Sequence, residues 1–144
     1  MLKGIPGVLS PKLLKVLMEM GHGDEIVIGD GNYPAASYAR RLLRCDGHGV
    51  PTLLDAILKL LPLDTYVQYP VALMAVAAND NTPTPYIWKE YESILHKHGY
   101  AAEKIEFMER FAFYDRSKDA YSIIATGESA IYANIILKKG VVKE

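Results

Sequence analysis

Apolar residues recur three and four positions apart in three stretches of the chain, and each stretch predicts a helix that faces a core. Leu13, Leu14, Leu17 and Met18 form such a stretch after Ser10-Pro11, where serine suits an N-cap and proline the first helical position. The three helices are bounded by Ser10-Pro11 and Gly21, by Pro51 and Pro62, and by Thr84-Pro85 and Gly99.

Short apolar runs lie between these helices and predict buried strands. The predicted strands are Glu25–Gly29, Leu42–Cys45, Val71–Ala77, Ile105–Met108, Tyr121–Ala125 and Asn134–Leu137. Residues 38–45 also favour a short helix before their strand, 113–119 a short helix, and 126–128 a turn or a short helix. Residues 30–34 and 79–84 are rich in polar residues, Gly and Pro, which is typical of loops.

Alternation of helices and strands predicts an α/β fold, a layered domain formed by residues 1–144. In such sheets, ligands bind outside the ends of the strands. Five polar residues fall at predicted element boundaries and are therefore candidates for a site: His22, Asp30, Arg110, Tyr132 and Asn134.

Composition excludes several classes of protein. The net charge of −1 provides no field for nucleic acid or an anionic membrane, and the single cysteine, Cys45, excludes an internal disulfide and a cysteine metal cluster. No apolar run approaches the roughly 20 residues that cross a bilayer, and Gly and Pro interrupt the first twelve residues. We therefore expect a cytoplasmic protein with no nucleic-acid or membrane partner.

The segment MGHGDEIVIGDGNYP, residues 20–34, carries the most distinctive chemistry. His22 lies between two glycines, and histidine exchanges protons near neutral pH. Asp30 follows the predicted strand, and we expect the two residues to share one site that transfers protons on a small polar ligand. Taken alone, residues such as His22 and Asp30 are more often structural residues of turns, and an arginine such as Arg110 beside Glu109 more often forms a surface ion pair. No second histidine has a ligand-like spacing, so we expect no metal.

Six segments of the chain resemble the L-fucose mutarotase family, which is related to D-ribose pyranase. They are LSPKLL at 9–14, MGHGDEIVIGD at 20–30, DGHGVPTLLDAILKLLPLDTYV at 46–67, TPYIWKEYESIL at 84–95, ERFAFYDR at 109–116 and ATGESAIYANIILKKG at 125–140. Their order and spacing cover nearly the whole chain and make the resemblance specific.

The resemblance implies a role for each candidate. His22 matches the family's proposed catalytic histidine. The substrate-binding residues implied are Asp30, Arg110, Tyr132 and Asn134. Ala133 stands where glycine is common, and two glycines flank Asp30 where other members carry larger residues. Secondary candidates for lining the site are Tyr66, Tyr69, Tyr114 and Trp88.

The resemblance also implies an activity and an assembly. A mutarotase interconverts the α and β anomers of a reducing sugar through ring opening and closure, which needs acid–base groups and no cofactor. The family often forms ring-shaped decamers, with some smaller oligomers, whose sugar sites lie in clefts between subunits. We therefore expect an L-fucose mutarotase that acts as a homo-oligomer.

Two other functions stay open at the level of sequence. One is D-ribose pyranase activity, which Arg110 disfavours because ribose-type members tend to have histidine at that place. The other is a non-catalytic sugar-binding or transport-accessory protein, which would keep Asp30, Arg110 and Asn134 but would not need His22. The intact histidine motif favours an enzyme.

Overall fold

A computed structural model describes all of residues 1–144 and contains one six-stranded sheet. The strands are β1 (Glu25–Gly29), β2 (Leu42–Cys45), β3 (Val71–Met74), β4 (Ile105–Met108), β5 (Ser122–Thr126) and β6 (Ile135–Lys138). Their order is β2-β5-β1-β6-β3-β4, and β6 runs antiparallel to both of its neighbours while the other pairs are parallel. The carboxyl ends of five strands therefore share one edge of the sheet with the amino end of β6.

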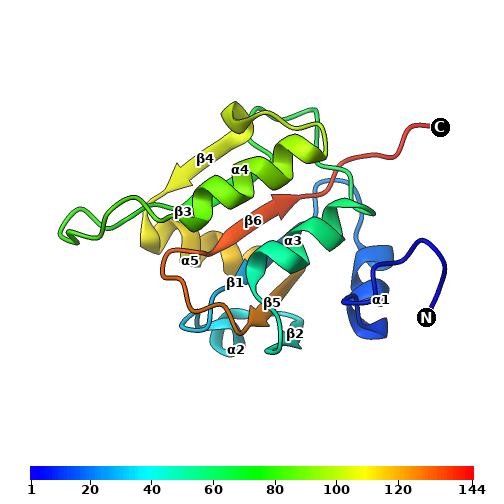
Figure 1. Cartoon of the computed structure of the whole chain (residues 1–144), viewed down its shortest axis with the longest axis horizontal. Coiled ribbons are helices and arrows are strands. Elements are labelled where there is room, and N and C mark those ends of the chain that lie inside the picture. Colours follow the sequence, from blue (N-terminus) through cyan, green and yellow to red (C-terminus); the bar gives the residue numbers. More distant parts are fainter.

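Helices cover both faces of this sheet (Figure 1). They are α1 (Pro11–Glu19), α2 (Ala35–Tyr38), α3 (Val50–Leu58), α4 (Ile87–Lys97), α5 (Arg110–Asp119) and a 3-10 turn at Ala102–Lys104. One core of 27 buried residues lies beneath α1, α3 and α4, and a second core of ten lies beneath α2 and α5. The predicted layered α/β fold is confirmed.

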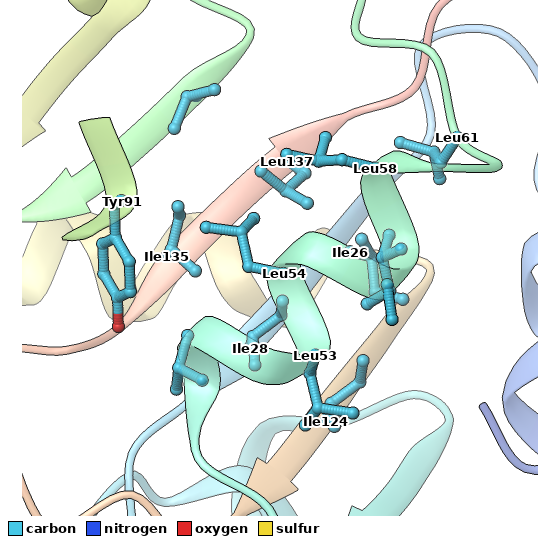
Figure 2. Close-up of a cluster of buried hydrophobic side chains, with 14 of the residues drawn as sticks. Ile26, Ile28, Leu53, Leu54, Leu58, Leu61, Tyr91, Ile124, Ile135 and Leu137 are labelled. Carbon is cyan, nitrogen blue, oxygen red and sulfur yellow. The ribbon is translucent and has the colours of Figure 1, made fainter. Parts of the chain in front are cut away.

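Alternation along each strand divides the side chains between the two cores. Ile26 and Ile28 of β1 point to the larger core, and Val27 points to the smaller one. Figure 2 shows Leu53 and Leu54 of α3 packed over these strands among other fully buried side chains. No helix is long and apolar enough to cross a membrane.

Several element boundaries differ from the predicted ones. β3 ends at Met74 rather than Ala77, and residues 126–128 form no helix. The predicted cap at Thr84-Pro85 is wrong, because α4 begins at Ile87 and no side chain caps it. The confirmed boundaries include the cap at Ser10, whose hydroxyl accepts a hydrogen bond from the Leu13 amide at 3.1 Å.

One further helix end moved for an identifiable reason. α5 begins at Arg110, three residues before the predicted start, because the Glu109 carboxylate accepts bonds from the Phe111 and Ala112 amides at 2.8 and 3.1 Å. Glutamate is not among the usual N-cap residues, so the sequence pattern did not reveal this cap. α1 ends as expected: its last residue is Glu19 and Met20 is the C-cap, so Gly21 lies directly beyond the helix, and Gly23 takes the left-handed conformation with φ +86°.

Candidate functional site

A pocket of about 250 Å³ opens at the edge where the parallel strands end. Its walls are the residues after β1, the end of β3 and its loop, the start of α5, and the residues before β6. They are Asp30, Asn32, Tyr33, Met74, Asp80, Arg110, Tyr114, Ile131, Tyr132 and Asn134. Four of the five predicted site residues are in this set, at the position where α/β sheets bind ligands.

Chain connectivity explains why Asp30 meets Asn134. β5 and β6 flank β1 in the sheet, so the segment that joins them passes over the carboxyl end of β1. The Asp30 amide consequently donates to the Asn134 side-chain oxygen at 2.8 Å, and an Asp30 carboxylate oxygen accepts from the Ala133 amide at 3.4 Å. Residues more than a hundred positions apart are thereby fixed against one another.

Burial is the main influence on the pKa of the Asp30 carboxyl group. Its residue is only 5% exposed, and desolvation raises the pKa of the carboxyl above its ordinary value, although hydrogen bonds from the Asn32 and Ala133 amides oppose this shift. A carboxylate with a raised pKa accepts a proton more readily than an exposed aspartate does. Asp30 can therefore bind a hydroxyl group and also take part in proton transfer.

Glycine at position 29 leaves room beside this carboxylate. A Cβ atom there would lie 2.7 Å from the Cβ and Cγ atoms of Tyr33, closer than packed atoms approach. The ring of Tyr33 can thus fold back beneath Asp30 and form part of the pocket wall. Gly29, one of the two glycines that flank Asp30, is therefore a packing requirement.

Tyr132 has an unusual backbone at the site. Its φ of +57° makes it the one residue other than glycine in the left-handed region, where a side chain costs energy. Two aromatic residues of α4 hold this turn: Trp88 Nε1 donates to the Tyr132 carbonyl at 2.9 Å, and the Tyr91 hydroxyl donates to the Ala133 carbonyl at 2.7 Å. The turn directs the phenol of Tyr132 toward the pocket wall.

Arg110 and Tyr114 come from the first turns of α5 and share a helix face, because residues four apart are neighbours. Glu109 does not pair with Arg110, since its carboxylate caps the helix. The guanidinium instead lies over the Phe111 ring at 4.6 Å and makes no ion pair. Its donors are available to a ligand in the pocket.

His22 lies at the opposite edge of the sheet, before the first residue of β1. Its Nε2 atom is 3.2 Å from a carboxylate oxygen of Asp64, its ring centroid is 5.5 Å from that of Tyr66, and its side chain is 47% exposed. Asp64 itself is buried, and hydrogen bonds from the Tyr66 amide and from His22 hold its pKa below the ordinary value. An aspartate–histidine pair of this kind fixes the orientation of the imidazole.

The expectation that His22 and Asp30 share a site within one chain is therefore wrong. The five residues of β1 separate them, and at about 3.3 Å per residue that strand alone spans roughly 16 Å. His22 does not line the pocket that contains Asp30. One chain therefore presents the pocket at one edge of the sheet and the His22 imidazole at the other.

Among the secondary candidates, only Tyr114 lines the pocket. Tyr66 lies beside His22, Trp88 lies behind the Tyr132 turn, and Tyr69 accepts a hydrogen bond from Gln68. Sequence reasoning missed Asn32, Met74 and Asp80 at the pocket, and Asp64 beside His22. Asp80 could have been found, because it lies in the polar segment that follows β3 at the same edge.

The family model described as the RbsD / FucU transport protein family matches residues 3–142. The chain belongs to the RbsD / FucU family. It is 51% identical over 146 aligned residues to the fucose mutarotase of Homo sapiens, with 97% of this chain and 94% of that protein covered. No group of three or more His, Cys, Asp or Glu side chains is arranged to hold a metal ion.

Solved structures of family members share the fold closely. The fucose mutarotase from Streptococcus pneumoniae, solved in complex with L-fucose, is 55% identical with a TM-score of 0.95, and 99% of this chain and 100% of that one are covered. The RbsD protein of Bacillus subtilis, solved in complex with D-ribose, is more distant, at 25% identity and a TM-score of 0.76 over 99% of this chain and 100% of that one.

Proposed function

We propose that this protein is an L-fucose mutarotase, an isomerase that interconverts the α and β anomers of the sugar without a cofactor. The observation that carries the proposal is the pocket at the strand ends, where Asp30, Arg110, Tyr132 and Asn134 come together. The 55% identity with a mutarotase solved with L-fucose supports the same substrate for this chain.

The four pocket residues suit the hydroxyl groups of a monosaccharide. Arg110 supplies only donors, the Asp30 carboxylate supplies acceptors, and the phenol and amide of Tyr132 and Asn134 supply both. A pocket of about 250 Å³ matches one small sugar ring rather than an oligosaccharide. A site built from such groups rejects epimers that would leave them unpaired.

The reaction needs two proton transfers. One proton leaves the anomeric hydroxyl and one reaches the ring oxygen, so that the ring opens to the free aldehyde; rotation about one bond and the reverse transfers close it on the other face. We assign the acid–base role to His22, oriented by Asp64, and a supporting role in proton acceptance to Asp30. A positioned general acid–base contributes typically 10²–10⁴-fold.

His22 must then reach the pocket of another copy of the chain. The pocket and the His22 imidazole, as two half-sites, lie at opposite edges of the sheet, so a homo-oligomer that joins the His22 edge of one copy to the pocket edge of another would complete the site. A decamer is the assembly expected from the family resemblance, and sedimentation velocity tests it. A cytoplasmic location also stays a prediction.

Anomer exchange at equilibrium tests the function directly. Saturation-difference NMR on the anomeric protons of L-fucose, with and without protein, should reveal exchange well above the spontaneous rate. The same measurement on D-ribose tests the pyranase alternative, which we consider because the more distant relative RbsD was solved in complex with D-ribose. Sugar binding without accelerated exchange would instead identify a transport-accessory protein and refute the enzymatic proposal.

A further inference from the structure

The loop between β3 and α4, residues 75–86, lies at the mouth of the pocket and is mostly exposed. Figure 1 shows it in green, projecting beyond the ends of the two elements that it joins. Asp80 near its tip is part of the pocket wall. A second hollow of about 400 Å³ lies against the later half of the loop.

The side chain of Tyr132, from the segment before β6, forms hydrogen bonds with the middle of this loop. The Tyr132 hydroxyl donates to a carboxylate oxygen of Asp80 at 2.5 Å and accepts from the Ala77 amide at 3.3 Å. These are the only hydrogen bonds between residues 76–84 and the rest of the protein. The Tyr132 phenol therefore holds the loop through two hydrogen bonds, to Ala77 and to Asp80.

The Asp80 carboxylate is held in place and kept ionised by its neighbour Thr82. The Thr82 hydroxyl and amide donate to its other carboxylate oxygen at 2.6 and 2.9 Å, which fixes the side chain and holds the pKa of Asp80 below its ordinary value. The ionised Asp80 raises the pKa of the Tyr132 phenol in turn, so the phenol keeps its proton. Charge-assisted bonds of this type are stronger than neutral ones.

We propose that Asp80 is a positioning residue for the sugar pocket, which fixes the Tyr132 phenol and latches the β3–α4 loop at the pocket mouth. The proposal rests on the proposed function, because it takes Tyr132 as a sugar-binding residue. A phenol has one proton and two lone pairs. Asp80 takes the proton and Ala77 takes one lone pair, so the remaining lone pair accepts a hydroxyl proton from the sugar.

The effect of removing Asp80 should appear in KM. Tyr132 contacts the sugar before and during the reaction, and a contact made equally in both states changes KM rather than kcat. Because the lost bond orients a sugar contact rather than making one, we expect KM to rise by about the worth of one ordinary hydrogen bond, roughly 5- to 10-fold. In Asp80→Ala, we therefore expect that rise with kcat within about twofold of wild type.

Three further variants separate the latch from a general effect on the loop. Asp80→Asn keeps an acceptor oxygen and should recover most of the affinity. Asn81→Ala changes the exposed neighbour, which makes no side-chain hydrogen bond, and should behave as wild type. In a Tyr132→Phe background, Asp80→Ala should add no further loss, because the bond is already gone.

Anomeric NMR at several L-fucose concentrations gives KM and kcat for each variant. Hydrogen exchange of residues 75–86, measured without sugar, reports the latch independently of activity. Amide exchange in this loop should be about fivefold or more faster in both Asp80→Ala and Tyr132→Phe, and unchanged in Asn81→Ala.

Two results would overturn the proposal: loop exchange unchanged in Asp80→Ala, or a KM increase that is equally large in the Tyr132→Phe background. A wild-type protein that fails to exchange L-fucose anomers would instead overturn the proposed function. The hydrogen-exchange comparison would still decide whether the latch exists, so the two failures are distinguishable.

Discussion

Mixing two inactive variants should restore activity if the half-sites on each chain are completed by another copy. His22→Ala removes the imidazole at one edge of the sheet, and Arg110→Ala removes the guanidinium at the other. Both side chains are substantially exposed, and Arg110 makes no ion pair, so each variant should fold and assemble as wild type does. An oligomer made only of the His22→Ala chain lacks the imidazole at every site, and one made only of the Arg110→Ala chain lacks the guanidinium at every site.

The size of the restoration follows from counting sites. A complete site needs an imidazole edge from the Arg110→Ala chain and a pocket edge from the His22→Ala chain. With equal amounts and random assembly, each condition holds at half of the sites, so about one quarter of all sites are wild type whatever the ring size. Loss of the imidazole alone should lower exchange on the order of 10²-fold, so the mixture should exceed that variant by roughly 25-fold.

Co-expression with two different affinity tags, followed by sequential purification, yields particles that contain both chains. Anomeric NMR on L-fucose then compares the mixed particles with each variant alone. As a control, His22→Ala is paired with the double variant His22→Ala/Arg110→Ala, a combination in which no complete site can form. If the mixed particles show only the mean of the two separate activities, every site lies within one chain and the shared-site reasoning is refuted.

Three other changes test separate parts of the structure. Arg110→His should reduce L-fucose exchange more than D-ribose exchange, because loss of a charge-assisted bond to fucose costs about 10–150-fold in rate. If the ratio of the two NMR rates stays unchanged, Arg110 does not select the substrate. The folded-state pKa of Asp64 lies below its ordinary value, so its carboxylate stabilises the fold above the unfolded-state pKa of about 4, and this effect is lost as pH falls through the folded-state pKa. The Tm difference between wild type and Asp64→Asn should accordingly shrink from pH 7 to pH 3, and a constant difference would contradict this linkage. Gly29→Ala should cost about 1–3 kcal/mol in thermal unfolding because the new Cβ meets Tyr33, whereas Gly47→Ala, where space is open, should be nearly neutral.

Local sequence signals predicted most of the elements. The apolar run Glu25–Gly29 is β1 to the residue, and the serine–proline pair at Ser10 caps α1 as expected, because backbone and side-chain preferences act within a few residues. The start of α5 escaped prediction, since its cap is a glutamate whose side chain reaches forward to Phe111 and Ala112.

The sequence alone also indicated which polar residues gather at the pocket. Asp30, Arg110, Tyr132 and Asn134 each fall where an element begins or ends, and the carboxyl ends of parallel strands meet at one edge. The family resemblance pointed to the same four residues together with His22.

Only the tertiary structure decided which residues His22 and Asp80 contact, whereas the separation of His22 from Asp30 follows from the predicted strand Glu25–Gly29 that lies between them. The order of the strands, with β6 inserted antiparallel between β1 and β3, places His22 beside Asp64. Periodicity specifies which face of a strand is buried, and it carries no information on which strands become neighbours. The bond from Tyr132 to Asp80 likewise joins two loops 52 residues apart. Such contacts exist only after the sheet has brought the chain segments together, so no local pattern could encode them.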